Sequence, residues 1–244
     1  MPFDASRIYH KIRYALCDIT YMLFLFFREN HNQMKDVIIP IVFPDYKIAV
    51  ATPRAVEVPD LIPFIDILPN NIQVPHTKAK MSNLGHAGVL FINGSNGVTK
   101  YYEYGRYDPK GNGWVKKIRN LPDVKIDPKG SITKESLTKV LSVISIKAGQ
   151  RGNISAAYIE VENKYSEILD FSINRMRKNH VPDRKEYGLF TYSCLHFMKG
   201  ALEAAGVETP TLIDPRPVSY IEELQEDYRV LEYVTSTNNY TLGK

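Results

Sequence analysis

Two side chains of this chain have the types and surroundings that covalent acyl chemistry requires, and the first of them is Cys194. It stands in TYSCLHFMKGALEAAG, where a short extended run turns into a helical pattern, with Thr191 or Ser193 available as the helix cap. A thiol in the first turn of a helix faces unpaired N–H groups and the positive end of the helix dipole, and both favour the nucleophilic thiolate. The competing interpretation is a small buried apolar residue, which is what most free cysteines are.

The second side chain is His86, because a cysteine nucleophile needs a general base that is held on a rigid element. His86 opens a predicted strand, HAGVLFI, and its neighbours Gly85, Ala87 and Gly88 are small. Small residues on both sides leave room for another chain or for a substrate to approach the imidazole. A lone histidine in a strand is more often structural, so the interpretation depends on its being paired with Cys194.

A third polar group usually orients such a histidine, and Glu103 is the candidate. The segments HAGVLFI and VTKYYEYG flank a Gly/Asn turn, NGSNG, and together predict a β-hairpin. If the turn is centred near Ser95 and Asn96, Glu103 lies two residues along from the partner of His86 and on the same face. Should the register slip, the alternatives are Tyr101 and Tyr102.

The other histidines and the second cysteine lack such surroundings. His196 lies two residues past Cys194 on the same predicted helix, about 200° around it, so we expect it to point away. His180 ends a helix and suits a cation at that terminus, and Cys17 fits a buried position in an apolar helix. The remaining histidines have no acid or thiol pattern around them: His10, His31 and His76. Because HExxH, CxxC, phosphate-loop, EF-hand and GxSxG patterns are absent from the sequence, we expect no metal, no nucleotide cofactor and no serine hydrolase.

The composition describes a globular protein without a nucleic-acid arm. Of the 244 residues, 44% are hydrophobic, and 16 Tyr and 10 Phe supply ample apolar surface for a core. The net charge of +4 is spread along the chain with no Lys/Arg run, so we expect no nucleic-acid partner. Two cysteines exclude a disulfide framework.

The N-terminal segment, residues 1–35, differs in pattern from the rest. Basic residues precede an apolar stretch, Tyr14 to Phe27, but no small-x-small cleavage site follows it. Asp18 interrupts the stretch, which is also shorter than the roughly 20 residues that span a bilayer. We therefore predict an apolar helical extension at 1–35 without stable transmembrane insertion and a second domain at 36–244. Membrane contact and an uncleaved export signal remain the alternatives to a docked helix.

The elements that must position the candidate residues alternate between strands and helices. Prolines recur through residues 36–80, which predicts extended segments around a core and argues against central strands. After the hairpin, the predicted elements are a helix capped by Ser131, a strand at 154–161, a helix at 165–176, an extended run at 187–193, a helix from Cys194 to Ala205 ended by Gly206, and a last helix at about 219–231. This order predicts the α+β class.

The combination of GHAGVLFINGSNGVTKYYEYGRYD with a later TYSCLHFMKGAL resembles the circularly permuted NlpC-type branch of the papain-like cysteine hydrolases. The resemblance implies a papain-like core in which an antiparallel sheet packs on helices, with an N-terminal helical or extended extension. It also implies that His86 is the base, Glu103 the orienting residue and Cys194 the nucleophile. Many members have histidine at the position of Glu103, and the first 35 residues match no pattern of the family.

More narrowly, IPIVFPDYKIAVATPRAVEV together with LGHAGVLFING and TKYYEYGRYDP is similar to bacterial type VI secretion effectors. That resemblance implies a peptidoglycan amidase or endopeptidase, made in the cytoplasm without a cleavable signal peptide and acting in the periplasm of a rival cell. It further implies a stem peptide as substrate, an immunity protein and a carrier in the secretion apparatus. The tyrosines near the site would line a groove for that peptide or pack across the sheet, and packing is favoured.

Two other functions stay open at this point. The first keeps the cysteine chemistry but directs it at protein or lipid, as a protease, deamidase or acyltransferase. The second is a non-catalytic binding module of the same fold, since fold alone does not fix function.

Overall fold

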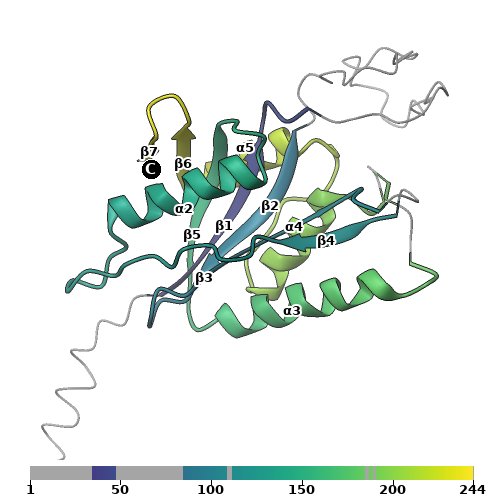
Figure 1. The fold of residues 1–244 in the computed structure, drawn as a ribbon, viewed down its shortest axis with the longest axis horizontal. Coiled ribbons are helices and arrows are strands. Elements are labelled where there is room, and N and C mark those ends of the chain that lie inside the picture. Colours follow the sequence, from purple (N-terminus) through teal and green to yellow (C-terminus); the bar gives the residue numbers. More distant parts are fainter. Residues whose placement is uncertain (1–34, 48–84, 109–111, 185–186, 189–190, 244) are drawn as a thin grey trace, which may run out of the picture.

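A computed structural model describes residues 35–47, 85–108, 112–184, 187–188 and 191–243, and all structural statements refer to these residues (Figure 1). Within them the strands are β1 (Asp36–Phe43), β2 (His86–Ile92), β3 (Thr99–Gly105), β4 (Trp114–Lys117), β5 (Ile154–Val161), β6 (Arg229–Val234) and β7 (Asn239–Leu242). The helices are α2 (Lys134–Lys147), α3 (Tyr165–Arg177), the short 3-10 turn η1 (Lys178–His180), α4 (Cys194–Ala204) and α5 (Pro217–Asp227).

The described strands form one antiparallel sheet in the order β4-β3-β2-β1-β5-β6-β7. Its central strands, β1 and β2, are buried along their whole length, because helices cover both faces of the sheet. Such strands read as continuous apolar runs, VIIPIVF and HAGVLFI, without the polar alternation of a half-exposed sheet. The α+β class with an antiparallel sheet packed on helices is therefore confirmed.

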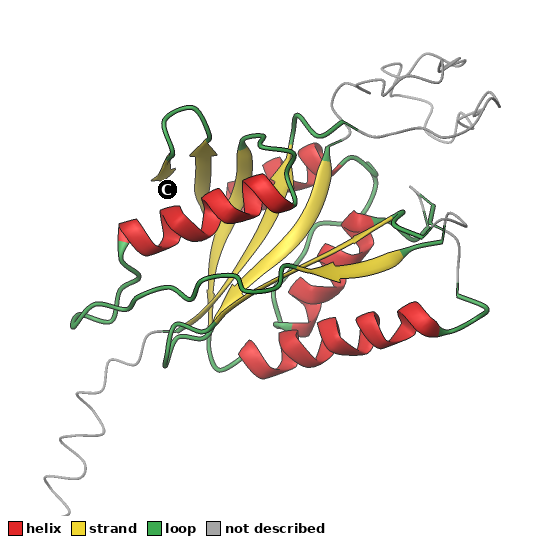
Figure 2. Ribbon diagram, viewed as in Figure 1, coloured by secondary structure: helices red, strands yellow, loops and turns green. Residues whose placement is uncertain are grey.

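The helices lie in two layers around the sheet (Figures 1 and 2). On one face α2 packs against the odd-numbered apolar positions of β1 and against β5 and β6. On the other face α4 packs under β2 and β3, flanked by α3 and α5. The helix that carries the candidate nucleophile is thus the one that covers the strands of the predicted hairpin.

The β2–β3 hairpin has the register that the sequence predicted. Gly88 pairs with Glu103 and Ile92 with Thr99, so that His86 stands opposite Gly105. The turn between them is closed by a hydrogen bond from Asn93 N–H to the carbonyl of Val98. The prediction that His86 and Glu103 lie on one face, two residues apart, is confirmed.

The prolines did not keep β1 out of the centre of the sheet, so that expectation was wrong. Pro40 lies in β1, where it pairs with Val89 of β2. The pairing with β5 is interrupted at residues 39 and 40 and resumes at Ile41. Proline has no N–H to donate, so the ladder is broken on the β5 side while the pairing with β2 continues.

Three further expectations about elements change. The helix predicted from Ser131 has Thr133 as its N-cap, and α2 begins at Lys134. The helix predicted to reach 231 ends at Asp227, and the chain then forms β6. The run at 187–193 contains a bridge between Gly188 and Tyr192 and a turn instead of a strand. The strand at 154–161 and the helix at 165–176 are confirmed, and α4 ends with Ala205 as its C-cap, followed by Gly206 in the left-handed conformation.

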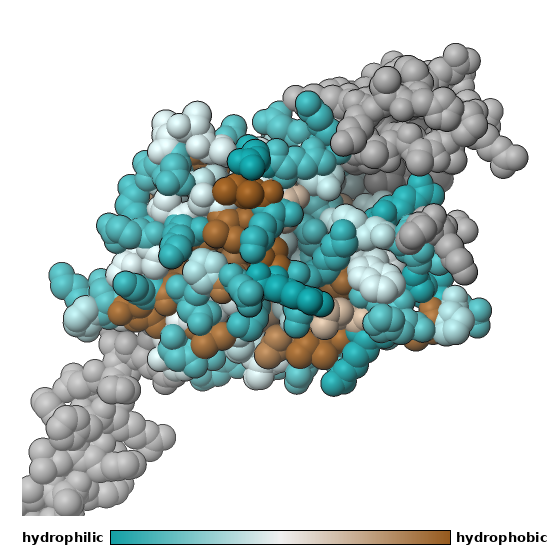
Figure 3. All heavy atoms as spheres, viewed as in Figure 1, coloured by the Kyte–Doolittle hydropathy of each residue, from teal (hydrophilic) through white to brown (hydrophobic). Residues whose placement is uncertain are grey.

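Polar residues cover most of the face seen in Figure 3, and hydrophobic atoms reach this surface beside α2 and α3. Among the described residues, no helix combines the length and the apolar character that crossing a bilayer demands. The predicted helical extension at 1–35 lies outside the described residues except for Lys35, so the division at residue 36 stays a prediction. The extended segments predicted at 48–80, and Cys17, also lie outside them.

Candidate active site

Cys194 is the first residue of α4, as the sequence predicted. Ser193 is the N-cap, and it forms a capping box with His196: the Ser193 N–H donates to His196 Nδ1, 3.3 Å away, and Ser193 Oγ lies 2.9 Å from the same nitrogen. His196 thus takes part in capping the helix. The Cys194 side chain is buried and belongs to the core cluster between α4 and the sheet.

His86 is the first residue of β2 and is held between aromatic rings. Phe43 pairs with it across β1 and stacks on the imidazole with ring centroids 6.3 Å apart. The ring of Tyr46 lies closer, at 4.7 Å. These contacts leave the imidazole buried and fix the plane of its ring.

Glu103 binds one nitrogen of that ring. The imidazole Nε2 is 3.2 Å from Glu103 Oε2 and 3.0 Å from the hydroxyl of Tyr107. Tyr107 donates to Glu103 Oε1 at 2.9 Å, and Tyr101 donates to Oε2 at 3.0 Å. Because both tyrosine hydrogens are directed at the carboxylate, Nε2 carries the proton that Glu103 accepts, which assigns the tautomer from the network.

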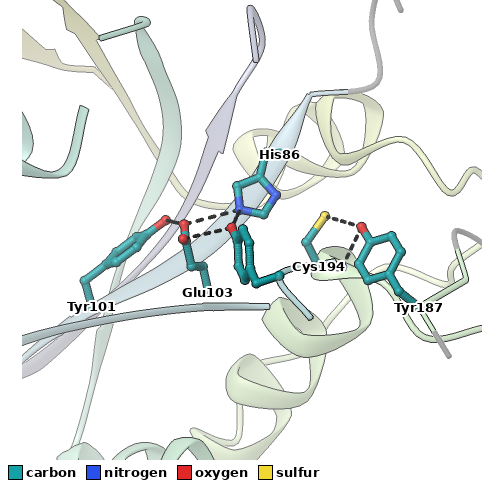
Figure 4. A network of polar contacts seen from close by, with 6 residues as sticks. His86, Tyr101, Glu103, Tyr187 and Cys194 are labelled. Carbon is teal, nitrogen blue, oxygen red and sulfur yellow. Dashed lines mark hydrogen bonds and ion pairs between the residues drawn. The ribbon is translucent and has the colours of Figure 1, made fainter. Parts of the chain in front are cut away.

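With Nε2 occupied by Glu103, the other ring nitrogen is left on the side of Cys194 (Figure 4). Burial alone would lower the pKa of His86, but hydrogen bonds and charge from Cys194 and Glu103 outweigh it and raise the pKa well above its usual value. Burial likewise raises the pKa of Glu103, yet its bonds to His86 and the two tyrosines lower the pKa overall. These two pKa directions favour an imidazolium cation beside an ionised carboxylate.

The pKa of the Cys194 thiol is shifted in the opposite direction to that of His86. Burial raises its pKa, but the hydrogen bond and charge of His86 lower it below the usual value. Two smaller contributions act in the same direction, from the hydroxyl of Tyr187 and from the backbone N–H of Ala87. The two pKa directions together favour a thiolate–imidazolium pair, which is the form in which a cysteine attacks a carbonyl.

Tyr187 covers the thiol from the other side (Figure 4). Its hydroxyl donates to Cys194 Sγ at 3.6 Å and accepts from the Cys194 backbone N–H at 3.4 Å. Burial and the neighbouring Cys194 raise the pKa of Tyr187, so the hydroxyl keeps its proton and acts as a donor. The N–H that it contacts is the first free donor of α4, where an anion would be stabilised.

The structure therefore brings together the three residues chosen from the sequence and adds two that sequence reasoning did not choose. Tyr107 belongs to the tyrosine-rich segment TKYYEYGRYDP but was not singled out in it, and neither was Tyr187. Tyr101, an alternative third residue, contacts Glu103 instead of replacing it, whereas Tyr102 packs on Phe91 on the opposite face. The space that Gly88 was expected to leave for a substrate is filled by Tyr101. Among the described residues, no group of three or more His, Cys, Asp or Glu side chains is placed to hold a metal ion.

Both comparisons that found a match identify type VI secretion system effectors. The model of the family "Type VI secretion system effector TseH-like" matches residues 38–209. A crystal structure of the type VI secretion system effector TseH is 34% identical in sequence, superposes with a TM-score of 0.67, and the match covers 86% of this chain and 98% of that chain. No curated protein matches the chain in sequence.

Proposed function

The chain belongs to the TseH-like family of type VI secretion system effectors, and on this premise we propose that it is a cysteine hydrolase that cleaves amide bonds of peptidoglycan. The observation that carries the proposal is the pairing of Cys194 with His86, in which each side chain shifts the pKa of the other toward the ion pair. A cysteine that served only as core packing would have its pKa raised by burial.

The proposed mechanism is two-step acyl transfer. The Cys194 thiolate attacks the carbonyl carbon, and the His86 imidazolium gives its proton to the leaving amine as the C–N bond breaks. The neutral imidazole then takes a proton from water, whose oxygen attacks the thioester and releases the acid and the thiol. Glu103 holds the imidazole in one tautomer and stabilises its positive charge through both steps.

The oxyanion of each tetrahedral intermediate needs donors at the start of α4. The backbone N–H of Cys194 is one of them. The hydroxyl of Tyr187 lies 3.4 Å from that nitrogen and keeps its proton, so it is the side-chain donor available beside the same position. A substrate carbonyl would then displace the bond between Tyr187 and the Cys194 N–H.

The biological setting follows from the family. An effector is delivered into target cells by the secretion apparatus, and we propose that this one acts on the stem peptides of peptidoglycan in the target periplasm. A carrier in the apparatus and an immunity protein that covers the Cys194 site in the producing cell complete the proposal. The assembled cell wall lies outside the cytoplasm, so lysis should depend on the compartment in which the protein is expressed.

The experiment that tests the proposal compares two compartments and three proteins. Wild type, Cys194→Ala and the matched control Cys17→Ala are expressed in a bacterium with and without a periplasmic signal, and purified protein is incubated with isolated sacculi. We expect lysis and release of peptide fragments from wild type and Cys17→Ala only, and lysis only with the signal. Equal lysis by Cys194→Ala would remove this cysteine from the mechanism, and intact sacculi after incubation with wild type would rule out the substrate.

A further inference from the structure

A cavity of about 270 Å³ opens beside the site, between β3, the end of α3 and the residues that follow η1. Tyr104 and Tyr192 form its aromatic side, and three basic residues line it: Arg175, Lys178 and Arg184. Asp183 is the one acidic residue in this lining. At this size the cavity holds a small group or one side chain, and its lining is cationic on balance.

A short chain of ring contacts connects this cavity to the thiol. The ring of Tyr187, whose hydroxyl contacts Cys194, stacks on the ring of Tyr104 with centroids 5.8 Å apart. Tyr104 in turn lies edge-on to Tyr192, at 6.0 Å. The rings of Tyr187 and Tyr104 therefore lie between the nucleophile and the cavity, which puts the cavity close to Cys194 in space.

The three basic side chains are not equivalent. Arg184 forms an ion pair with Asp108 and hydrogen bonds to two backbone carbonyls, of Gly113 and Val181, so its role is largely structural. Arg175 donates one N–H to the hydroxyl of Tyr192 at 2.7 Å and lies over the rings of Tyr192 and Tyr104.

Lys178 differs from both. It is exposed, and its side chain has no hydrogen bond or ion pair with the residues that the structure describes. Arg175 is fixed in place by aromatic rings and has further N–H donors, and the Lys178 ammonium has no ion-pair partner among the described residues. An anion in the cavity would satisfy both.

We propose that this cavity binds a free carboxylate of the substrate peptide, on a residue next to the amide bond that Cys194 attacks. The inference rests on the proposed function, because it takes the substrate to be a peptide. It adds that the enzyme selects peptides by charge: Arg175 and Lys178 bind the carboxylate, and Tyr104 and Tyr192 pack against the carbon chain that carries it. A peptide whose carboxylate is amidated keeps its shape but loses the charge that these two residues recognise.

The experiment measures binding and not hydrolysis. The full-length Cys194→Ala protein is titrated with a synthetic peptidoglycan stem tetrapeptide that has free carboxylates, and with the same peptide fully amidated. A charge-assisted bond contributes enough affinity that we expect the amidated peptide to bind at least about tenfold more weakly. Introducing Lys178→Gln should weaken binding of the free acid and leave binding of the amide unchanged. The matched control is Arg177→Gln, one residue earlier and exposed, with Asn174 as its side-chain partner, and it should change neither affinity.

Equal affinity for the two peptides, or no measurable binding of either one, would overturn the inference. So would a loss of affinity for the amide that matched the loss for the acid in Lys178→Gln, because that pattern reports a structural effect. The proposed function fails separately, if wild type leaves isolated sacculi intact. Since Cys194→Ala does not hydrolyse its ligand, a preference for the free acid would stand whether or not peptidoglycan is the substrate that is cleaved.

Discussion

The ring of Tyr101 lies against the Cα of Gly88 on the neighbouring strand and fills the space that a Cβ would take. Gly88 pairs directly with Glu103, and from its place over the glycine Tyr101 reaches the carboxylate, at 3.0 Å from Oε2. Gly105 has the same relation to Tyr107, whose ring lies where its Cβ would be. Because Gly88 and Gly105 have no side chains, the two tyrosine rings can lie over their backbone. From there the tyrosine hydroxyls donate hydrogen bonds to Glu103, the carboxylate that binds His86.

Gly88→Ala should therefore damage the site through Tyr101. A methyl group at Gly88 would overlap the Tyr101 hydroxyl and ring edge, so the ring must move and Glu103 loses a donor. We expect a loss of stability of about 1–3 kcal/mol, as for other overpacked positions, and a fall in kcat/KM of about tenfold, as when one hydrogen bond to a charged group is lost. Chemical denaturation and steady-state hydrolysis of a stem peptide measure the two effects.

Two variants distinguish the steric effect of the added methyl group from the loss of the Tyr101 hydrogen bond. Gly243→Ala adds the same methyl group where no atom lies within 4 Å, so it should behave as wild type. Tyr101→Phe removes the hydroxyl but keeps the ring, and should reproduce the loss of activity without the overpacking. Full activity in Gly88→Ala would contradict the role given to Tyr101.

The pH profile of the activity should have an acid limb and an alkaline limb. The pKa of Cys194 is lowered, so the thiolate forms at lower pH than in a free cysteine, and the pKa of His86 is raised, so the imidazolium persists to higher pH. The ion pair exists between these two values. We expect a bell-shaped profile of kcat/KM, with the acid limb reporting Cys194 and the alkaline limb reporting His86.

Glu103→Gln tests which group sets the alkaline limb. The carboxylate is one of the two groups that raise the pKa of His86, and its own pKa is lowered, so it is ionised across the working range. An amide keeps the shape but removes the charge, so the alkaline limb should move to lower pH and kcat/KM should fall about 100-fold. Glu160→Gln, an exposed acid in β5, is the control. An unmoved alkaline limb in Glu103→Gln would assign that limb to another group.

The reactivity of the thiol gives an independent measure of the same ion pair. In a Cys17→Ser background, Cys194 is the only thiol, and its alkylation by iodoacetamide is followed as a function of pH. The midpoint should lie below the value of about 8.5 for an unperturbed cysteine. His86→Ala should raise the midpoint strongly, and Tyr187→Phe should raise it less, because the hydroxyl bond to Sγ is one of the smaller contributions. A midpoint that His86→Ala does not change would mean that no ion pair forms.

The positions of His86 and Glu103 in the hairpin, and of Cys194 at the start of α4, were predictable because local signals determine them. The turn NGSNG sets the register, and a period of two then places Glu103 on the face of His86, as the pairing of Gly88 with Glu103 confirms. The residue types at the helix start left Thr191 and Ser193 as candidate caps of α4, and the structure has Ser193. What these residues do stays a proposal, since geometry alone does not measure activity.

The rest depends on contacts that local patterns do not encode. Tyr107 lies beyond the end of β3, where alternation no longer assigns a face, and it reaches His86 only because Gly105 makes room. Tyr187 reaches the thiol through the turn that the Gly188–Tyr192 bridge closes.

Two misassigned elements have the same kind of cause. The helix predicted at about 219–231 included the first three residues of β6, although the buried positions of this strand, Leu231 and Tyr233, have a period of two. Pro40 was read as excluding a central strand, but long-range pairing with β2 outweighs the one N–H that proline lacks.

The outer strand β4 forms two hydrogen bonds with a single side-chain amide group, that of Asn179. Asn179 accepts from the Val115 N–H at 2.8 Å and donates to the Val115 carbonyl at 2.9 Å, and its side chain is buried. Asn179→Ala would leave both backbone groups of Val115 without these partners, which should cost about 1–3 kcal/mol for each buried group left unsatisfied. Asn174→Ala, on the exposed side of α3, should cost much less.

Asn179→Asp sharpens this last prediction. The carboxylate still accepts from the Val115 N–H but cannot donate, and it places a buried charge against the Val115 carbonyl. It should therefore destabilise at least as much as Asn179→Ala, and the difference should shrink as the pH falls and the carboxyl group gains a proton. Urea denaturation at two pH values measures this. If Asn179→Asp were as stable as wild type at neutral pH, the hydrogen bond that the Asn179 amide donates to the Val115 carbonyl would contribute nothing to stability.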